Sequence, residues 1–222
     1  MSVIRLNIIV EGQTEEAFVK NVLAEHLWQH NIYATPKLVR TGNMNTRAHK
    51  GGLSDYEKLK RELQRWIKQD QGAWFTTMMD LYAYPKNAPG YAFRQSSEPY
   101  ARVTGLEQDL VTDIDSPRFI PYLQLHEFET LLFSDLSKWT RALPENGEDI
   151  EALAKSIANF TDVELINDGS ETAPSKRILA HVPRYDKVAF GASIATEIGL
   201  NVIRSNCRHF NCWLTKLENL GT

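Results

Sequence analysis

The sequence of 222 residues has little cysteine, no long apolar run and a small net charge, and each absence excludes a class of protein. Its two cysteines, Cys207 and Cys212, lack the spacing of a zinc ligand set, and no complementary His/Cys pair occurs elsewhere. Such usage is typical of the reducing cytoplasm, which is where we expect this protein. A formal net charge of -3 argues against a protein that coats nucleic acid wholesale, so any phosphate-binding face must be local.

Membrane segments are also lacking. No uninterrupted apolar stretch is long enough to span a bilayer, and the first residues have neither the apolar core nor the cleavage site of a signal peptide. We therefore expect no membrane partner. What is present is a hydrophobic content of 42%, which is enough to form one sizeable core.

Short apolar runs alternate with segments of helical spacing through the first part of the chain. The alternation predicts an α/β domain with a mainly parallel sheet of about four strands flanked by helices. Pro121 suits an edge position for the last strand. The predicted strands are 3–10, 36–40, 72–80 and 119–125, and the predicted helices are 15–30, about 55–67, 98–111 and 126–133.

The remainder of the chain shows mostly helical spacing. No linker-like composition separates it from the first part, so we expect an α/β domain at 1–135 and a helical C-terminal extension at 136–222 packed on it. The helices are expected at roughly 148–158, 174–181, 190–199 and 203–219. A stripe on the last of these is expected to be core or partner interface, and consists of Phe210, Trp213, Leu214 and Leu217.

Acidic residues follow several of the predicted strands. Glu11 follows the first strand, Asp80 ends the third, and Glu127 follows the fourth, with Glu129 just beyond. The carboxyl ends of parallel strands lie on one edge of a sheet, so we expect these acids to converge there. Two carboxylates about 4 Å apart repel by roughly 4 kcal/mol at an effective dielectric constant near 20, so the cluster needs protons or a cation. Hard oxygen ligands favour Mg²⁺ or Mn²⁺.

Simpler interpretations exist for some of these residues. Glu11 could equally be an incidental acid at a strand end, and one of Glu127 and Glu129 could be only a favourable charge in the first turn of a helix. For Asp80 the simpler role would be that of a helix N-cap. Prolines soon after it prevent a helix from starting there, so this role is disfavoured. His126 is expected to be a hydrogen-bonding neighbour, since the other candidate ligands are all hard oxygens.

The first turn of the first helix carries two further acids, Glu15 and Glu16. Acids in this position interact favourably with the helix dipole, so we expect both to be solvent-exposed. Gly12, directly before them, would allow a backbone or a phosphate to approach closely and tolerates unusual dihedral angles.

Two basic segments are candidates for phosphate binding. The loop 40–52 carries Arg47 and Lys50 after the second strand, although it could equally be a solvated loop. In 171–178, Lys176 and Arg177 stand near the exposed N–H groups of a helix start, where an anion would be welcome. A salt bridge of these cations with Glu171 is the alternative.

Three motifs together resemble the TOPRIM fold, the topoisomerase–primase domain that also occurs in overcoming-lysogenisation-defect nucleases. They are "VEGQTEE", "MMDLYAYP" and "LHEFETLLFSD". With the later "PSKR", the chain more closely resembles an uncharacterised bacterial family of small TOPRIM-like proteins. The resemblance implies that Glu11 acts in acid–base chemistry or supports a metal, and that a D-x-D pair binds Mg²⁺. This chain departs from the pattern, because Tyr82 stands where the second acid belongs.

We therefore expect a nuclease, a divalent-metal-dependent phosphodiesterase that acts on DNA or RNA in bacterial defence or repair. Glu11, Asp80 and Glu127 or Glu129 would hold the metal, and Lys176 would neutralise the phosphate together with Arg177. The alternative is a non-catalytic TOPRIM-like module that binds a partner protein. The family resemblance implies that this partner is an ATPase.

Overall fold

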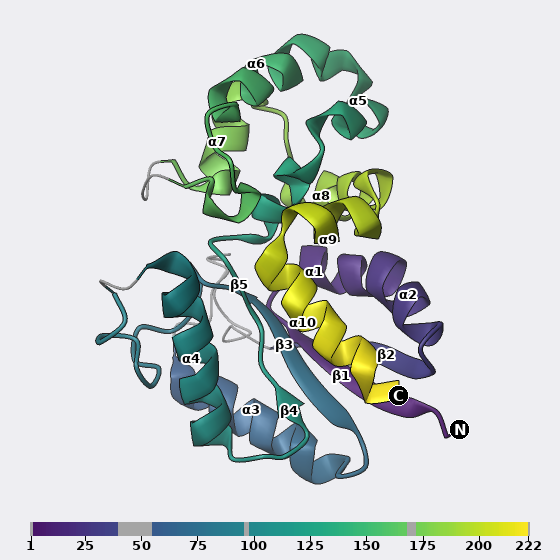
Figure 1. Cartoon of the computed structure of the whole chain (residues 1–222), viewed down its shortest axis with the longest axis vertical. Helices are drawn as coiled ribbons and strands as arrows, with labels where there is room; N and C mark the ends of the chain where they lie inside the picture. Colours follow the sequence, from purple (N-terminus) through teal and green to yellow (C-terminus); the bar gives the residue numbers. More distant parts are fainter. Residues whose placement is uncertain (1, 40–54, 96–97, 168–171, 222) are drawn as a thin grey trace, which may run out of the picture.

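The computed structural model describes residues 2–39, 55–95, 98–167 and 172–221. Within them, a parallel sheet has the strand order β2-β1-β3-β4, and a short fifth strand, β5, also pairs with β3 (Figure 1). The α/β class with a mainly parallel sheet is thus confirmed. The strands are β1 (Ile4–Val10), β2 (Ile32–Leu38), β3 (Trp74–Asp80), β4 (Phe119–Ile120) and β5 (Leu123–Gln124).

The register of the strands brings their carboxyl ends together. Val10, the last residue of β1, pairs with Met78 of β3, so Glu11 follows at the level where β3 is about to end. Asp80 in turn pairs with Gln124, the last residue of β5. Acids that follow or end these three strands therefore start from the same edge of the sheet.

Helices cover both faces of the sheet (Figure 1). Residues 13–28 form one continuous helical segment with a π-helical middle. On the other face, α3 is capped by Asp55, whose side chain accepts a hydrogen bond from the Glu57 N–H at 3.1 Å. The helices of this part are α1 (Gln13–Phe18), η1 (Val19–Leu23), α2 (Ala24–Trp28), α3 (Tyr56–Gln69), α4 (Pro99–Ile114) and the 3₁₀ helix η2 (Phe128–Ser134).

The C-terminal helices lie beyond the carboxyl edge of the sheet and then return to it. In Figure 1, α5, α6 and α7 lie farthest from the sheet, and α10 runs back along one of its faces. The elements are η3 (Leu136–Lys138), α5 (Trp139–Ala142), η4 (Pro144–Asn146), α6 (Gly147–Ile157), η5 (Val163–Leu165), α7 (Pro174–His181), α8 (Lys187–Ile198), α9 (Leu200–Asn206), α10 (Arg208–Glu218) and η6 (Asn219–Gly221).

The alternation of side chains in β1 creates a hydrophobic core on each face of the sheet. Leu6, Ile8 and Val10 belong to one cluster, whereas Ile9 belongs to the other. The second cluster contains buried side chains of α3 and α4. The first contains the predicted stripe of the last helix, which is confirmed as core: Phe210, Trp213, Leu214 and Leu217 are all buried.

Several predicted element boundaries are wrong. The second strand covers Ile32–Leu38 rather than 36–40, because Pro36 is accommodated inside a strand that lies at the end of the strand order. The fourth predicted strand is interrupted at Tyr122, whose N–H donates to the Thr77 hydroxyl at 2.8 Å instead of a strand carbonyl. The predicted helix at 126–133 is a 3₁₀ helix over 128–134.

The C-terminal boundaries also differ. The helix predicted at 190–199 begins at Lys187, and the helix predicted at 203–219 is broken at Cys207 into α9 and α10. No helix among the described residues combines the length and apolar character that crossing a membrane requires.

Candidate functional site

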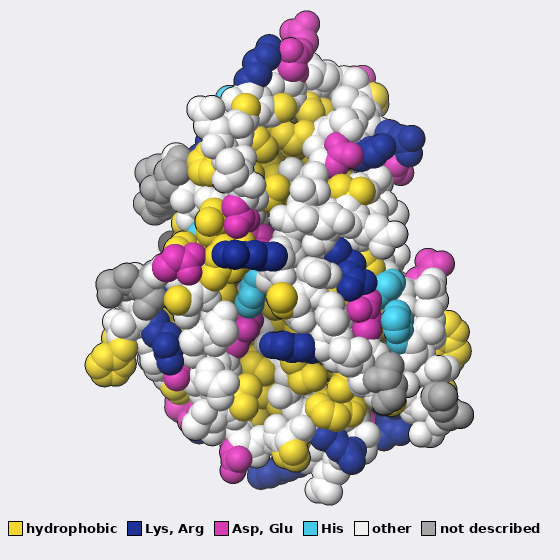
Figure 2. All heavy atoms as spheres, viewed as in Figure 1, with side chains coloured by type: hydrophobic (Ala, Val, Ile, Leu, Met, Phe, Trp, Pro, Cys, Tyr) yellow, Lys and Arg dark blue, Asp and Glu magenta, His cyan; other side chains and the backbone are white. Residues whose placement is uncertain are grey.

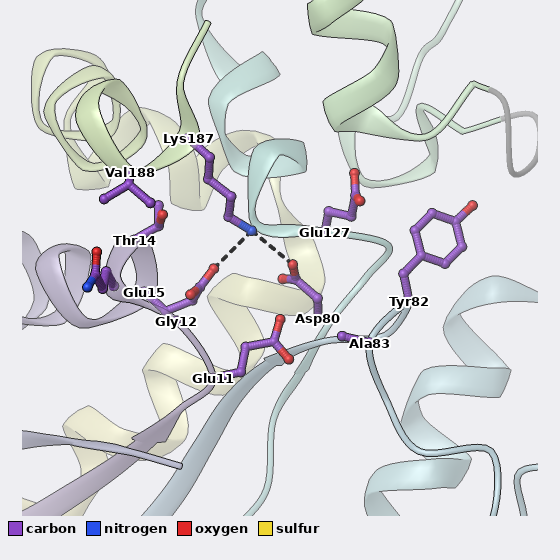
Figure 3. A pocket seen from close by; sticks show the side chains of 11 residues that line it. Glu11, Gly12, Thr14, Glu15, Asp80, Tyr82, Ala83, Glu127, Lys187 and Val188 are labelled. Carbon is purple, nitrogen blue, oxygen red and sulfur yellow. Dashed lines mark hydrogen bonds and ion pairs between the residues drawn. The ribbon is translucent and has the colours of Figure 1, made fainter. Parts of the chain in front are cut away.

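The carboxyl edge of the sheet carries a cluster of acidic side chains around one lysine, which we call the acid cluster: Glu11, Glu15, Asp80, Glu129 and Lys187. Figure 3 shows Lys187 extending from the start of α8 toward Glu15 and Asp80, with Glu11 beneath them. The Lys187 Nζ lies 3.1 Å from Glu15 Oε1, 3.1 Å from Asp80 Oδ2 and 3.3 Å from Glu129 Oε2. The residue after β1 and residues of α1, β3, η2 and α8 therefore meet at one point.

The packing of α8 on α1 delivers Lys187 to this point. Asp186 caps α8 by accepting hydrogen bonds from the Val188 and Ala189 N–H groups, at 2.9 and 3.0 Å. One turn on, Gly191 lies so close to α1 that a Cβ added there would be 2.8 Å from Thr14 Cγ2. A larger residue would hold the two helices apart and move the lysine away from the acids.

The prediction that Glu15 is exposed to solvent is wrong. Its exposed fraction is 2%, because α8 covers the first turn of α1. Gly12 permits the arrangement in a way that we did not expect. It has an ordinary extended conformation (φ −140°), but a Cβ at this position would lie 2.6 Å from Glu15 Oε2. The close approach at Gly12 is thus made by a side chain of the protein itself.

Burial leaves several carboxylate oxygens of the acid cluster without hydrogen bonds. Glu11 Oε2, Asp80 Oδ1 and both oxygens of Glu129 have no hydrogen-bond partner among the described residues. The exposed fractions of Asp80 and Glu129 are only 5% and 1%. Because four carboxylates surround one ammonium group, negative charge remains in excess among these described side chains. An uncompensated buried charge of this kind is costly, so the cluster calls for protons or a further cation.

The pKa values of the cluster reflect this cost. Burial, followed by the neighbouring carboxylates, raises the pKa of Glu11 well above its usual value. Burial also raises the pKa of Glu15 and Asp80, although Lys187 opposes the shift, and it raises the pKa of Glu129 to about 7. For Lys187, burial disfavours the charge, but the surrounding acids outweigh it and raise the pKa well above the usual range. The lysine is therefore charged near neutral pH.

The donor atoms fit a hard divalent cation. Glu11, Glu15 and Asp80 each offer a carboxylate oxygen, and these oxygens lie within 4.8 Å of one another. The oxygens without hydrogen bonds belong to the same group of acids, and Mg²⁺ or Mn²⁺ takes such ligands. A cavity of about 410 Å³ lies against them, and its lining includes Glu11, Asp80, Glu127 and Lys187. It has room for a phosphate group beside the acids.

Glu127 reaches the same cavity but is also committed to a second contact. Its carboxylate accepts hydrogen bonds from the Ser175 N–H at 2.8 Å and the Ser175 hydroxyl at 3.0 Å. Ser175 lies in the first turn of α7, which is the helix start where the sequence predicts a phosphate. A carboxylate of the chain thus binds in the position that an anion would take.

The predicted phosphate-binding cations lie elsewhere or outside the described part. Lys176 is exposed on α7, and Arg177 places its guanidinium 5.4 Å from the ring centre of Phe160. Neither is among the described residues that line the cavity. Arg47 and Lys50 lie outside the described residues, so their predicted role stays a prediction.

Tyr82 and His126 stand at the rim of the site. Tyr82 lines the cavity and is 44% exposed, so it leaves the place of the expected second acid open to solvent. Asn167 contacts the Tyr82 hydroxyl and lies 3.0 Å from His126 Nδ1. Burial, with a smaller effect of Arg102, lowers the pKa of His126 to about 4, so its ring is neutral at pH 7. His126 is a hydrogen-bonding neighbour, as expected from the sequence.

The two residues that sequence reasoning missed are Glu15 and Lys187. For Glu15 the sequence does offer a signal. It follows Glu11 by only four residues, in the first turn of a predicted helix, so its carboxylate could reach the same sheet edge. For Lys187 the sequence offers only a capping Asp before a helix. Nothing in that pattern relates residue 187 to acids more than 50 residues away in the chain.

Comparison with known proteins assigns the chain to a protein family. Residues 10–218 match the family described as "Domain of unknown function (DUF4276)", and the chain belongs to it. No curated protein matches the chain. Two solved structures are similar to it over almost their full lengths. One is the C-terminal region of the Xanthomonas campestris pv. campestris OLD protein, with 13% sequence identity and a TM-score of 0.47. The alignment covers 100% of this chain and 98% of that structure's chain. The C-terminal region of the Burkholderia pseudomallei OLD protein has 15% identity, covers 99% of each chain, and has a TM-score of 0.46.

Proposed function

We propose that this protein is a divalent-metal-dependent phosphodiesterase that cleaves DNA or RNA. The observation that carries the proposal is the convergence of Glu11, Glu15, Asp80 and Glu129 at one sheet edge, with buried carboxylate oxygens that lack hydrogen bonds. Together with Glu127 they would hold Mg²⁺ or Mn²⁺. The bound ion would supply positive charge to the phosphate and increase the acidity of the attacking water.

The side chains of the chain itself would carry the remaining tasks. Glu11 lines the cavity, where its carboxylate can accept a proton from the attacking water. Lys187 also lines the cavity, and its ammonium group can donate to a phosphate oxygen that enters. Lys187 would thus act where negative charge accumulates during phosphoryl transfer, which is the step that charge stabilisation accelerates most.

Lys176 and Arg177 take a more distant role in this proposal. They lie outside the lining of the cavity, on α7, whose first turn is joined to the site through Ser175 and Glu127. From there they would contact phosphates of the same strand beyond the cleaved bond. Such contacts position a nucleic acid without reading its sequence.

The test is cleavage of single- and double-stranded DNA and RNA by wild-type protein and by Glu11→Gln, with Mg²⁺, Mn²⁺ or EDTA. We expect metal-dependent cleavage that Glu11→Gln reduces by about 100-fold or more, since proton transfer by a positioned group contributes at least that much. Glu16→Gln is the matched control, because Glu16 lies nearby on α1 but pairs with Lys20 and does not line the cavity. Undiminished cleavage by Glu11→Gln would contradict the assignment.

A second candidate function is a non-catalytic module that binds a partner, such as an ATPase. The observation that favours it is Lys187, which already compensates part of the acidic charge without any ion. In that case no substrate is cleaved with either metal. The Glu11→Gln protein then binds its partner as the wild-type protein does.

A further inference from the structure

A second group of potential metal ligands lies where α2 meets the end of α10, with no residue in common with the acid cluster. His26 lies in α2, His30 follows one turn later, and Glu218 is the last residue of α10. His26 Nε2 is 2.5 Å from Glu218 Oε1, and His30 Nε2 is 3.9 Å from the same oxygen. On the face drawn in Figure 2, histidine side chains lie beside acidic and basic ones over this junction.

We propose that His26, His30 and Glu218 form a binding site for a transition-metal ion such as Zn²⁺. One ligand atom of each residue lies within 4.8 Å of the others, and the two imidazole rings lie with their centres 5.2 Å apart, His26 on α2 and His30 in the turn that follows it. Two imidazoles and a carboxylate are a typical Zn²⁺ ligand set, with water completing the tetrahedron.

The existing hydrogen bond marks the place of the ion. In the absence of metal, one proton is shared between His26 Nε2 and Glu218 Oε1. An ion takes its place when the Nε2–H bond breaks and frees the nitrogen lone pair for the metal. From a neutral ring the proton is transferred through solvent to Nδ1, and from a protonated ring it is released to solvent. Metal–ligand bonds of about 2.0–2.2 Å require the two atoms to separate by under 1 Å, and His30 to move closer.

Arg204 holds the carboxylate in position for this role. Its guanidinium contacts Glu218 Oε1 and donates to Oε2 at 3.0 Å, while its Nε donates to Asn211 at 2.8 Å. Each carboxylate oxygen has two lone pairs, so Oε1 can accept from Arg204 and still bind an ion. A ligand that is itself hydrogen-bonded in this way is typical of metal sites in proteins.

The ligand chemistry separates this site from the acid cluster. Imidazole nitrogens favour Zn²⁺ and disfavour Mg²⁺, whereas the acid cluster offers oxygen alone. A bound ion would tie the helix after β1 to the last helix of the chain. Its consequence would be stability and not cleavage, so the proposal does not depend on the function proposed above.

The experiment is thermal unfolding of EDTA-treated, dialysed protein with added Zn²⁺ or Mg²⁺, for wild type, His30→Gln and His181→Gln. At a Zn²⁺ concentration about 100 times Kd, we expect Tm of the wild type to rise by roughly 5–10 °C. His30→Gln should lose most of this rise while keeping the metal-free Tm. His181→Gln, a histidine on α7, should behave as the wild type does.

Two further outcomes decide the proposal. Co²⁺ should give the visible absorption of a tetrahedral site in the wild type and not in His30→Gln. An absent Zn²⁺ effect on the wild type, or an equal rise in Tm for His30→Gln, would overturn the proposal. An effect of Zn²⁺ that depends on Glu11 and not on His30 would place the ion in the acid cluster and overturn it too.

Discussion

Two of the places where this molecule buries carboxylates are built in opposite ways. Glu164 is fully buried between α4 and α10, and its oxygens accept from the His209 N–H at 2.7 Å, the Phe210 N–H at 3.1 Å and the Tyr100 hydroxyl at 3.1 Å. In the acid cluster, by contrast, oxygens of Glu11 and Asp80 have no hydrogen-bond partner among the described residues. The protein thus supplies hydrogen-bond donors to both oxygens of Glu164, whereas it leaves oxygens of the acid cluster without donors.

This difference separates a structural acid from a candidate functional one. Glu164 accepts hydrogen bonds from N–H groups at the start of α10 that have no acceptor within the helix. The same hydrogen bonds stabilise its negative charge. The acid cluster keeps an excess of negative charge that only protons or a cation from solution can remove. Burial and a raised pKa are common to both places, so neither property alone identifies a site.

The largest expected effect is that of removing the cation inside the acid cluster. Lys187→Met deletes the ammonium group and keeps the aliphatic part, so the surrounding carboxylates lose their compensation. We expect the free energy of unfolding at pH 8 to fall by about 3 kcal/mol. Millimolar Mg²⁺ should restore much of the loss, because the ion replaces the ammonium charge. Urea unfolding with and without Mg²⁺ measures both effects.

A matched control for Lys187 is Lys155→Met. Lys155 pairs with Glu151 on the surface of α6, so its removal should leave the midpoint of urea unfolding unchanged. Equal behaviour of the two variants would show that the acids do not depend on Lys187. The contrast between the two buried carboxylate sites would then lose its basis.

The next effect concerns the satisfied site. Glu164→Ala leaves the first N–H groups of α10 without their acceptor, while the Tyr100 hydroxyl keeps Asp162 as its acceptor. The free energy of unfolding should fall by about 2 kcal/mol, and Mg²⁺ should not restore it. Urea unfolding in the same buffers checks this. Recovery of Glu164→Ala by Mg²⁺ would contradict the distinction between the two places.

Taken per unit of pH, the smallest effect is the dependence of stability on pH. The pKa of Glu129 is raised from 4.5 to about 7 in the folded state. Between these values the folded protein binds a proton that the unfolded chain has released, so stability falls as pH rises. One such proton contributes up to about 1.4 kcal/mol per pH unit. The raised pKa of Lys187 adds nothing here, because the lysine is charged in both states throughout this range.

Comparison with Glu129→Gln isolates this contribution from other titrating groups. The wild type should lose stability relative to Glu129→Gln as pH rises from 5 to 7, and saturating Mg²⁺ should reduce the difference. Urea unfolding at half-unit steps of pH provides the curve. A difference that is constant with pH would rule out the raised pKa.

The sequence predicts the sheet and part of the site for the same physical reason. Apolar runs ending in Glu11 and Asp80 indicate parallel strands, and parallel strands bring their ends to one edge. The positions of Glu15 and Lys187 depend instead on the packing of α8 against α1 through Gly191, which local pattern does not encode. Lys176 and Arg177 were recognised from a helix start, but the same helix start binds Glu127 of the chain itself.

The most direct test of the acid cluster as a cation site is calorimetric titration of Mg²⁺ into the wild type, Asp80→Asn and His30→Gln. We predict saturable binding to the wild type and to His30→Gln, and its loss in Asp80→Asn. Absence of Mg²⁺ binding to the wild type, or binding that Asp80→Asn leaves unchanged, would contradict the assignment.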